Sequence, residues 1–223
     1  MNTNKKTARI AGFLYFMYFV TSIIANMFGR FVFVDASATV NHIMAHESQF
    51  RIGFVISLFS VVFFLLAAWY LYVLLKPVNK NIALLFLLLN LGGFAIWCFS
   101  LLNLFAGLLL LSGADYLKVF QPDQLQAQAM LFINLYKSGY IVAQIPYGVW
   151  LFPLGYLFFK SRFLPKILGI LLIADFFGLL IFVIQRFLLP GYEVISYPCT
   201  AVSFIAELSL TFWLLIKGVK EQK

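Results

Sequence analysis

The sequence has 223 residues, of which 63% are hydrophobic and 11% charged, and its mean hydropathy is +0.97. A soluble core of this size could not enclose so much apolar surface, so the composition excludes a soluble globular protein. A net charge of +8 would suggest a nucleic-acid partner in a soluble protein. In a membrane protein the position of the charges carries the information instead, and we expect no nucleic-acid partner.

Six apolar runs are long enough to cross a hydrocarbon layer of roughly 30 Å as α-helices, which rise about 1.5 Å per residue. They cover residues 10–33, 52–75, 82–111, 129–159, 167–187 and 198–216. A membrane strand must belong to a closed barrel, and the alternating pattern of a barrel is absent. The sequence therefore predicts an all-α, polytopic membrane protein, in which residues 1–223 form a single domain of six transmembrane helices.

Basic residues collect before the first span, after the last, and in two of the turns between spans. They are Lys5, Lys6 and Arg9; Lys76 and Lys80; Lys160, Arg162 and Lys166; and Lys217, Lys220 and Lys223. With six spans, all four groups lie on one side of the membrane. By the positive-inside rule that side is the cytoplasm, so both termini are predicted to be cytoplasmic. On the other side, residues 37–51 have the pattern of a short amphipathic surface helix.

Two acidic residues lie deep within the predicted spans. Measured along each helix from the cytoplasmic basic residue beside the span, Asp175 lies about 14 Å and Glu207 about 15 Å deep in the membrane, near the bilayer midplane. Asn90 lies at the same depth. Charge is costly at this depth, so we expect these side chains to face the bundle interior. Two interpretations stay open: a proton-responsive, cation-binding or ligand-binding site, or hydrogen bonds that only hold the helices together.

A second set of polar residues lies nearer the outer surface. Measured in the same way from the cytoplasmic basic residue beside each span, Asn26 and Gln144 lie about 25 Å deep, and Tyr147 lies one turn below Gln144. Three basic residues lie about 30 to 35 Å from the same starting points: Arg30, Lys137 and Arg186. Together they would form an outward-facing vestibule with a basic rim above an acidic floor. Alternatively, the basic side chains snorkel to lipid phosphates.

The fourth span contains two Pro-x-Gly units, Pro146 with Gly148 and Pro153 with Gly155. Prolines free backbone carbonyls and kink a helix, and broken helices often line cavities in transporters. Membrane helices also tolerate proline without any functional role, and both interpretations stay open.

Aromatic residues are abundant in every span. We assign the row in the first span, which includes Tyr18, to lipid contact and packing. The four tryptophans are scattered over four spans and predict no aromatic cage. They are Trp69, Trp97, Trp150 and Trp213.

Motifs for enzymatic chemistry and for cofactors are absent. His42 and His46 have a spacing that can bind zinc, but the sequence lacks the His-Glu-x-x-His order and has no third histidine, so they are weak metal candidates. Cys98 and Cys199 are expected to be buried thiols. We predict no metal and no cofactor.

Four stretches together resemble a known family. They are ARIAGFLY at 8–15, FRIGFVISL at 50–58, GYLFFKSRFLPKILG at 155–169 and AELSLTFWLLIKGV at 206–219. They are similar to the bacterial membrane proteins grouped as domain of unknown function 4386. The resemblance implies a compact multi-pass protein of a bacterial cytoplasmic membrane, surrounded by membrane lipids. It supplies no activity and no catalytic residues.

The favoured hypothesis is a protein that binds or moves a small or lipid-like ligand in a central, outward-facing cavity with Asp175 and Glu207 at its floor. A non-catalytic membrane subunit or scaffold acting through a partner is the alternative, and either protein could form homo-oligomers. An intramembrane enzyme is less favoured, because no nucleophile or metal set accompanies the carboxylates.

Overall fold

The structure, a computed structural model, describes residues 3–29 and 36–220, and in these ranges helices are joined by turns and loops without any β-strand. The α-helices are α1 (Thr3–Gly29), α2 (Ala36–Ala45), α3 (Glu47–Leu75), α4 (Lys80–Leu110), α5 (Pro122–Val149), α6 (Leu151–Lys160), α7 (Lys166–Leu188) and α8 (Ser196–Phe212). Two short 3₁₀ turns, η1 (Asp115–Leu117) and η2 (Glu193–Ile195), precede α5 and α8, and a π-helical turn, η3 (Trp213–Lys217), follows α8.

Six helical segments of the described chain are long and apolar enough to cross a membrane, which confirms the predicted all-α, six-span architecture. The fourth segment begins at Pro122 instead of at the predicted residue 129. The predicted span began at residue 129 because residues 122–128 are mostly polar. A capping box starts the helix earlier, because the backbone N–H of Gln121 donates to the Gln124 side chain, 3.1 Å away.

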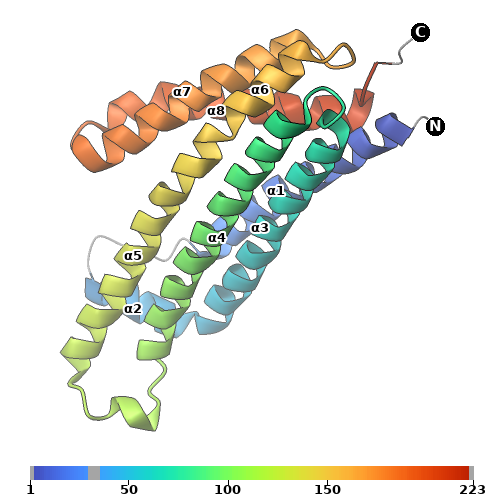
Figure 1. The fold of residues 1–223 in the computed structure, drawn as a ribbon. Helices are drawn as coiled ribbons and strands as arrows, with labels where there is room; N and C mark the ends of the chain where they lie inside the picture. The colour runs from blue at the N-terminus through green and yellow to red at the C-terminus, as the bar shows by residue number, and fades with distance from the viewer. Residues whose placement is uncertain (1–2, 30–35, 221–223) are drawn as a thin grey trace.

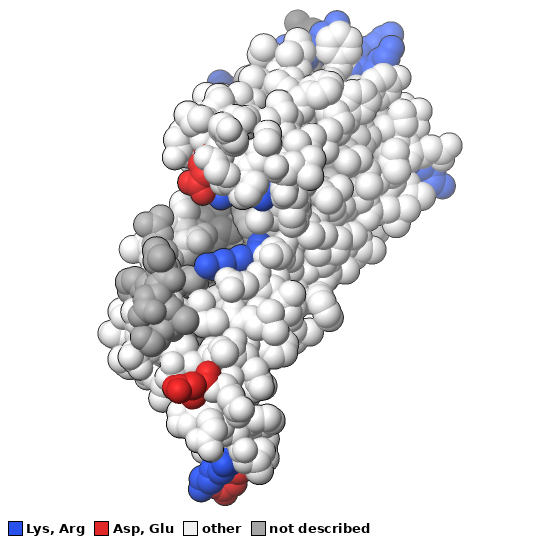
Figure 2. Space-filling model, turned by 90° about the vertical axis from the view of Figure 1, so that its left-hand side faces the viewer, with Lys and Arg blue, Asp and Glu red and all other residues white. Residues whose placement is uncertain are grey.

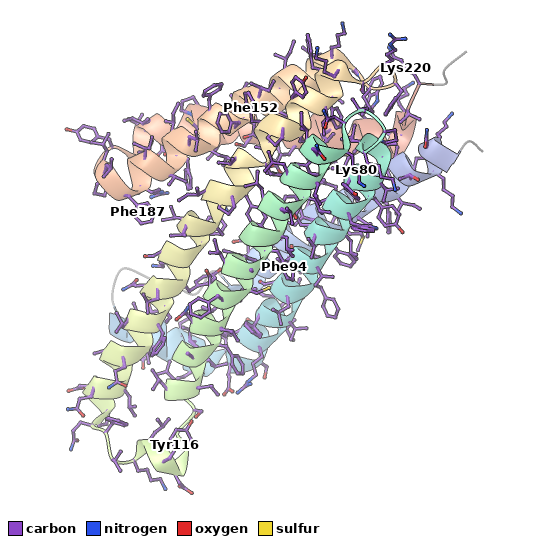
Figure 3. The ribbon with its side chains drawn as sticks, in the orientation of Figure 1. Lys80, Phe94, Tyr116, Phe152, Phe187 and Lys220 are labelled. Atoms are coloured by element: carbon purple, nitrogen blue, oxygen red, sulfur yellow. The ribbon has the colours of Figure 1, made fainter. Side chains whose placement is uncertain are left out.

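The helices form an antiparallel bundle in which both termini lie at the same end (Figure 1). At that end the backbone N–H of Lys220 donates to the Phe163 carbonyl in the α6–α7 turn, at 2.9 Å. Lys80 and Lys220 lie at this end of the bundle, and Tyr116 lies at the opposite end (Figure 3). The even number of spans and the shared end agree with the predicted clustering of basic residues on one side.

The tight turns at this end follow from local sequence. Pro77 follows the end of α3, and the Asn79 side chain caps α4 by accepting hydrogen bonds from the backbone N–H groups of Asn81 and Ile82, both at 3.1 Å. In the other turn, the Ser161 hydroxyl accepts from the Leu164 N–H at 3.2 Å, just before α7.

The predicted irregularity of the fourth span is a break at Trp150, which separates α5 from α6. Pro146 lies inside α5, and Pro153 lies in the first turn of α6. Since Pro153 has no N–H, it cannot donate to the carbonyl four residues earlier, so the hydrogen-bond pattern is interrupted beside Trp150. The break turns a fully buried tryptophan toward the centre of the bundle.

Close helix contacts depend on glycine at a few positions. A Cβ on Gly169 would lie 2.6 Å from the Gly155 carbonyl oxygen, and one on Gly155 would lie 2.7 Å from that of Gly169. Helices α6 and α7 therefore touch backbone to backbone, which only glycine permits. Gly12 plays the same part between α1 and η3, because a Cβ there would lie 2.5 Å from the Leu215 nitrogen.

Candidate ligand cavity

A cavity of about 560 Å³ lies between α1, α3, α4, α5, α7 and α8. Its deeper part reaches Trp150 at the α5–α6 break and Glu207 midway along α8. Its outer part reaches Asn26 near the end of α1 and Arg186 near the end of α7. Both of these helix ends point away from the end that carries the termini, so the cavity opens toward the opposite side of the bundle.

The structure brings together six of the nine candidate ligand-binding residues in the lining of this cavity. They are Asn26, Lys137, Gln144, Tyr147, Arg186 and Glu207. Arg30 lies outside the described residues. Asp175 and Asn90 are fully buried and do not line the cavity. The candidates therefore divide into a group that faces the cavity and a group that lies within the helix packing.

Glu207 is half-buried and its carboxyl group faces the cavity. It sits on α8 among tyrosine side chains, with Tyr15, Tyr18 and Tyr140 all within electrostatic range of the carboxyl. Within the described part of the chain, no lysine or arginine forms an ion pair with it. Glu207 is therefore an acidic group at the cavity floor with no cationic partner among the described residues.

Asp175 has different surroundings, although it lies at a similar predicted depth. The Ser203 hydroxyl on α8 donates a short hydrogen bond to its Oδ1, and this bond joins α7 to α8. The other oxygen, Oδ2, has no hydrogen-bond partner among the described residues. Asp175 lies close enough to Glu207 for the two carboxyl groups to interact.

Asn90 is the third residue predicted at this depth. It is fully buried in α4, and neither its amide nitrogen nor its amide oxygen has a hydrogen-bond partner among the described residues. Asn90 therefore lies within the helix packing and contributes nothing to the cavity lining.

The mouth of the cavity carries the basic residues. Arg186 forms an ion pair with Glu193, at 3.0 Å between Nη1 and Oε1, and its guanidinium lies over the Phe182 ring. Lys137 is exposed and lines the cavity without an ion pair to any residue the structure describes. Figure 2 shows this face of the molecule hollowed, with lysine and arginine atoms beside the hollow.

Aromatic side chains form much of the cavity wall, and here the sequence analysis was incomplete. Tyr18 was predicted to contact lipid or pack against other helices, and the scattered tryptophans predicted no cage. In the structure the cavity is lined by Tyr18, Trp97 and Trp150. Tyr18 stacks on Phe64 with ring centroids 4.5 Å apart, and Phe64 in turn meets Trp150 edge to face at 5.2 Å. Residues from three separate spans meet in this cluster, so no local spacing could have indicated it.

Serine side chains on α1 and α3 also line the cavity and were missed. The Ser22 and Ser60 hydroxyls lie 2.5 Å apart and link the two helices. Ser57 lies one turn from Ser60 and donates to the Gly53 carbonyl of its own helix at 2.9 Å. The spacing of Ser57 and Ser60, three residues apart on one helix face, was the available signal.

The remaining candidates lie elsewhere. His42 and His46 stack with ring centroids 4.3 Å apart on and just after α2. No group of three or more metal-ligating side chains occurs in the described residues. Both cysteines are free thiols; Cys199 is buried, as predicted, whereas Cys98 is only partly buried.

Comparison with protein families gives a match that covers residues 10–218, to the model of "Domain of unknown function (DUF4386)". The chain belongs to this family. The resemblance noted in the four sequence stretches is thereby confirmed. Glu207 and the cavity-lining residues of all six spans fall inside the matched region.

A curated relative from the archaeon Archaeoglobus fulgidus is described as "Uncharacterized protein". It is 33% identical over 150 residues, which cover 67% of this chain and 74% of the relative. No solved structure matches the chain.

Proposed function

We propose that this protein binds, and moves between the membrane and one aqueous side, a small or lipid-like ligand in the cavity between its six spans. The observation that carries the proposal is the cavity itself, with Glu207 at its floor and Lys137 and Arg186 at its mouth. Its volume of about 560 Å³ falls in the range of small-molecule sites, which are mostly apolar with a few polar groups.

The orientation belongs to the same proposal. The mouth lies at the end opposite the termini, so with cytoplasmic termini the cavity opens outward. Basic side chains at that depth would attract anionic or polar groups of a ligand entering from the outside or from the outer leaflet. In a bacterial cell the protein would reside in the cytoplasmic membrane.

Native mass spectrometry of the full chain in a mild detergent tests the proposal, with subunit number and any added mass recorded together. Ser57→Phe places a ring in the cavity, whereas Val55→Phe places the same ring on the exposed face of the same helix. We expect an added mass on the wild type and on Val55→Phe, and its loss from Ser57→Phe.

Two results would overturn the proposal. A bare chain in all three proteins, with no compound from a flux or binding screen retained, would remove the ligand. A reproducible complex with another protein chain, combined with an empty cavity, would favour the subunit or scaffold role instead.

A further inference from the structure

The floor of the cavity carries an acidic side chain. Glu207 is the one acidic residue of the described lining, and no lysine or arginine that the structure describes forms an ion pair with it. Asp175 lies behind it and interacts with it electrostatically. The basic residues are at the mouth, where Arg186 is already paired with Glu193. A carboxylate in this position gains most from a cation supplied by the ligand.

Aromatic rings surround the same part of the cavity. Phe64 is the centre of a cluster, with ring centroids 4.5 Å from Tyr18, 5.1 Å from Tyr147 and 5.2 Å from Trp150. All four side chains line the cavity together with Glu207. Tyr18 lies within electrostatic range of the carboxyl group.

A second aromatic group lies on the α4–α5 side of the cavity. The Trp97 ring meets Tyr140 edge to face with centroids 4.7 Å apart, and Tyr140 is also within electrostatic range of Glu207. The faces of aromatic rings carry negative electrostatic potential. Ring faces and a carboxylate that share one space repel anions and attract cations.

We propose that the ligand carries an organic cation, an amine or quaternary ammonium group, which lies between Glu207 and the aromatic rings of Tyr18, Phe64 and Trp150. This inference rests on the proposed function and names the class of its ligand. Lys137 at the mouth favours a polar or anionic outer end, so a zwitterionic or amphipathic ammonium compound fits the whole cavity.

Other cations fit the site less well. A bare metal ion prefers several oxygen or nitrogen ligands at once, and the described lining contributes one carboxylate. A proton alone would neutralise Glu207 but would leave the space between the rings empty. An organic cation provides both the charge and the apolar surface, and it binds ring faces without losing a tightly held water shell.

Tetraphenylphosphonium and tetraphenylborate are suitable probes, because the two ions have nearly the same size and shape and opposite charge. Binding of each radiolabelled ion to the full chain in a neutral detergent is measured by scintillation proximity. We expect saturable binding of tetraphenylphosphonium and none of tetraphenylborate above the detergent background. Tighter binding of the borate would overturn the inference, because the basic mouth would then select the ligand.

Variants of charged residues locate the site. Glu207→Gln keeps the shape and should weaken tetraphenylphosphonium binding about tenfold or more, a loss expected for a partly buried charge pair. Asp115→Asn, in the exposed η1 turn, is the matched control and should bind like the wild type. Lys137→Gln removes a positive charge from the mouth and should therefore bind the cation more tightly. Unchanged binding in Glu207→Gln would contradict the inference.

Variants of the rings test the aromatic contribution. Phe64→Leu keeps apolar volume but removes the ring at the centre of the cluster, and it should weaken cation binding about threefold to thirtyfold, as expected for a desolvated cation–π contact. If Phe64→Leu misfolds, Tyr18→Leu supplies the same test, because it removes another of the three proposed rings. Binding that is unchanged in a folded ring variant would rule the rings out.

Competition identifies the source of the ammonium group. Displacement of the bound cation by dodecylphosphocholine indicates a lipid headgroup, and displacement by choline indicates a soluble compound; both results support the inference. One outcome separates this inference from the proposed function. If neither the cation nor its competitors bind, but the wild type carries an added mass that Ser57→Phe removes, the protein binds a ligand that is not an organic cation. If the wild type carries no added mass either, both the proposed function and this inference are wrong.

Discussion

The Ser203 hydroxyl on α8 donates a hydrogen bond to the fully buried carboxyl group of Asp175 on α7. One turn further along α8, Glu207 faces the cavity, and its carboxyl group lies beside the Tyr15 side chain of α1. The two acidic residues that the sequence places at the same depth therefore have different surroundings. Asp175 joins two helices, and Glu207 is available to a ligand.

Removing the Ser203 hydroxyl should destabilise the fold. In Ser203→Ala both oxygens of Asp175 lack a donor, so we expect a loss of about 1 kcal/mol or more in the free energy of unfolding. In Asp175→Asn the amide oxygen can accept the same hydrogen bond without a buried charge, so its stability should stay within about 1 kcal/mol of the wild type. Unfolding by sodium dodecyl sulfate in mixed micelles measures both. A stable Ser203→Ala beside an unfolded Asp175→Asn would contradict this.

The contact between α6 and α7 should be intolerant of any side chain at Gly169. A Cβ there would lie 2.6 Å from the Gly155 carbonyl oxygen and 2.9 Å from the Phe159 nitrogen, so Gly169→Ala should cost about 1 to 3 kcal/mol. Gly92→Ala is the control, because the nearest atom to its Cβ is 3.9 Å away. It should be neutral or stabilising by up to about 1 kcal/mol. Equal effects of the two variants on the melting temperature would disprove the close contact.

Gln185 should stabilise the hairpin between α7 and α8. The Ser196 hydroxyl donates to its Oε1 at 2.6 Å, and its Nε2 donates to the Leu189 carbonyl at 2.9 Å. Gln185→Leu leaves both groups without this partner and should cost about 1 to 3 kcal/mol. Amide hydrogen exchange of the hairpin should accelerate in Gln185→Leu. The control is Thr200→Val, which removes only hydrogen bonds within α8 and should leave the exchange rate of the hairpin unchanged. An equal increase of the exchange rate in both variants would contradict the role of Gln185.

The proposed orientation predicts the behaviour of reporter fusions in a bacterial host. Green fluorescent protein fused to the C-terminus should fluoresce, because it folds in the cytoplasm. Alkaline phosphatase inserted between residues 112 and 121 should be active, since that loop lies at the opposite end of the bundle. Active phosphatase at the C-terminus, with an inactive insertion at 112–121, would reverse the orientation and place the mouth of the cavity on the cytoplasmic side.

Much of the architecture could be predicted from the sequence, because each membrane span is a long run of apolar residues. The six spans are such runs, and the basic turns around Lys80 and Lys166 mark their ends. The start of α5 could not be placed, since its first two turns are polar and project beyond the apolar run; the signal was the Gln121–Gln124 capping box.

The depth of polar residues was predictable in part. Helical rise places Glu207, Gln144 and Lys137 at increasing heights, and the structure puts all three in one cavity lining. Rise along a helix axis says nothing about which way a side chain points around it. For that reason Asn90 and Asp175 were grouped with Glu207, although they lie inside the helix packing.

The aromatic walls could not be predicted. Phe64, Tyr147 and Trp150 meet at the α5–α6 break, and their partner Tyr18 comes from the first span. In an apolar span, an aromatic residue that faces lipid and one that faces a cavity have the same local sequence pattern. Only the packing of α1 and α3 against the broken helix separates the two cases.

The most direct test of the account is labelling of Ser57→Cys in intact cells by a membrane-impermeant maleimide, in a chain whose Cys98 and Cys199 have been replaced by alanine. Ser57 lines the cavity, and Val55, the control for cysteine substitution, lies on the exposed outer face of the same helix. The account predicts that Ser57→Cys is labelled from outside, that Val55→Cys is not, and that tetraphenylphosphonium protects Ser57→Cys. Labelling absent at Ser57→Cys, or present and unaffected by the cation, would contradict a ligand cavity that opens outward and ends at Glu207.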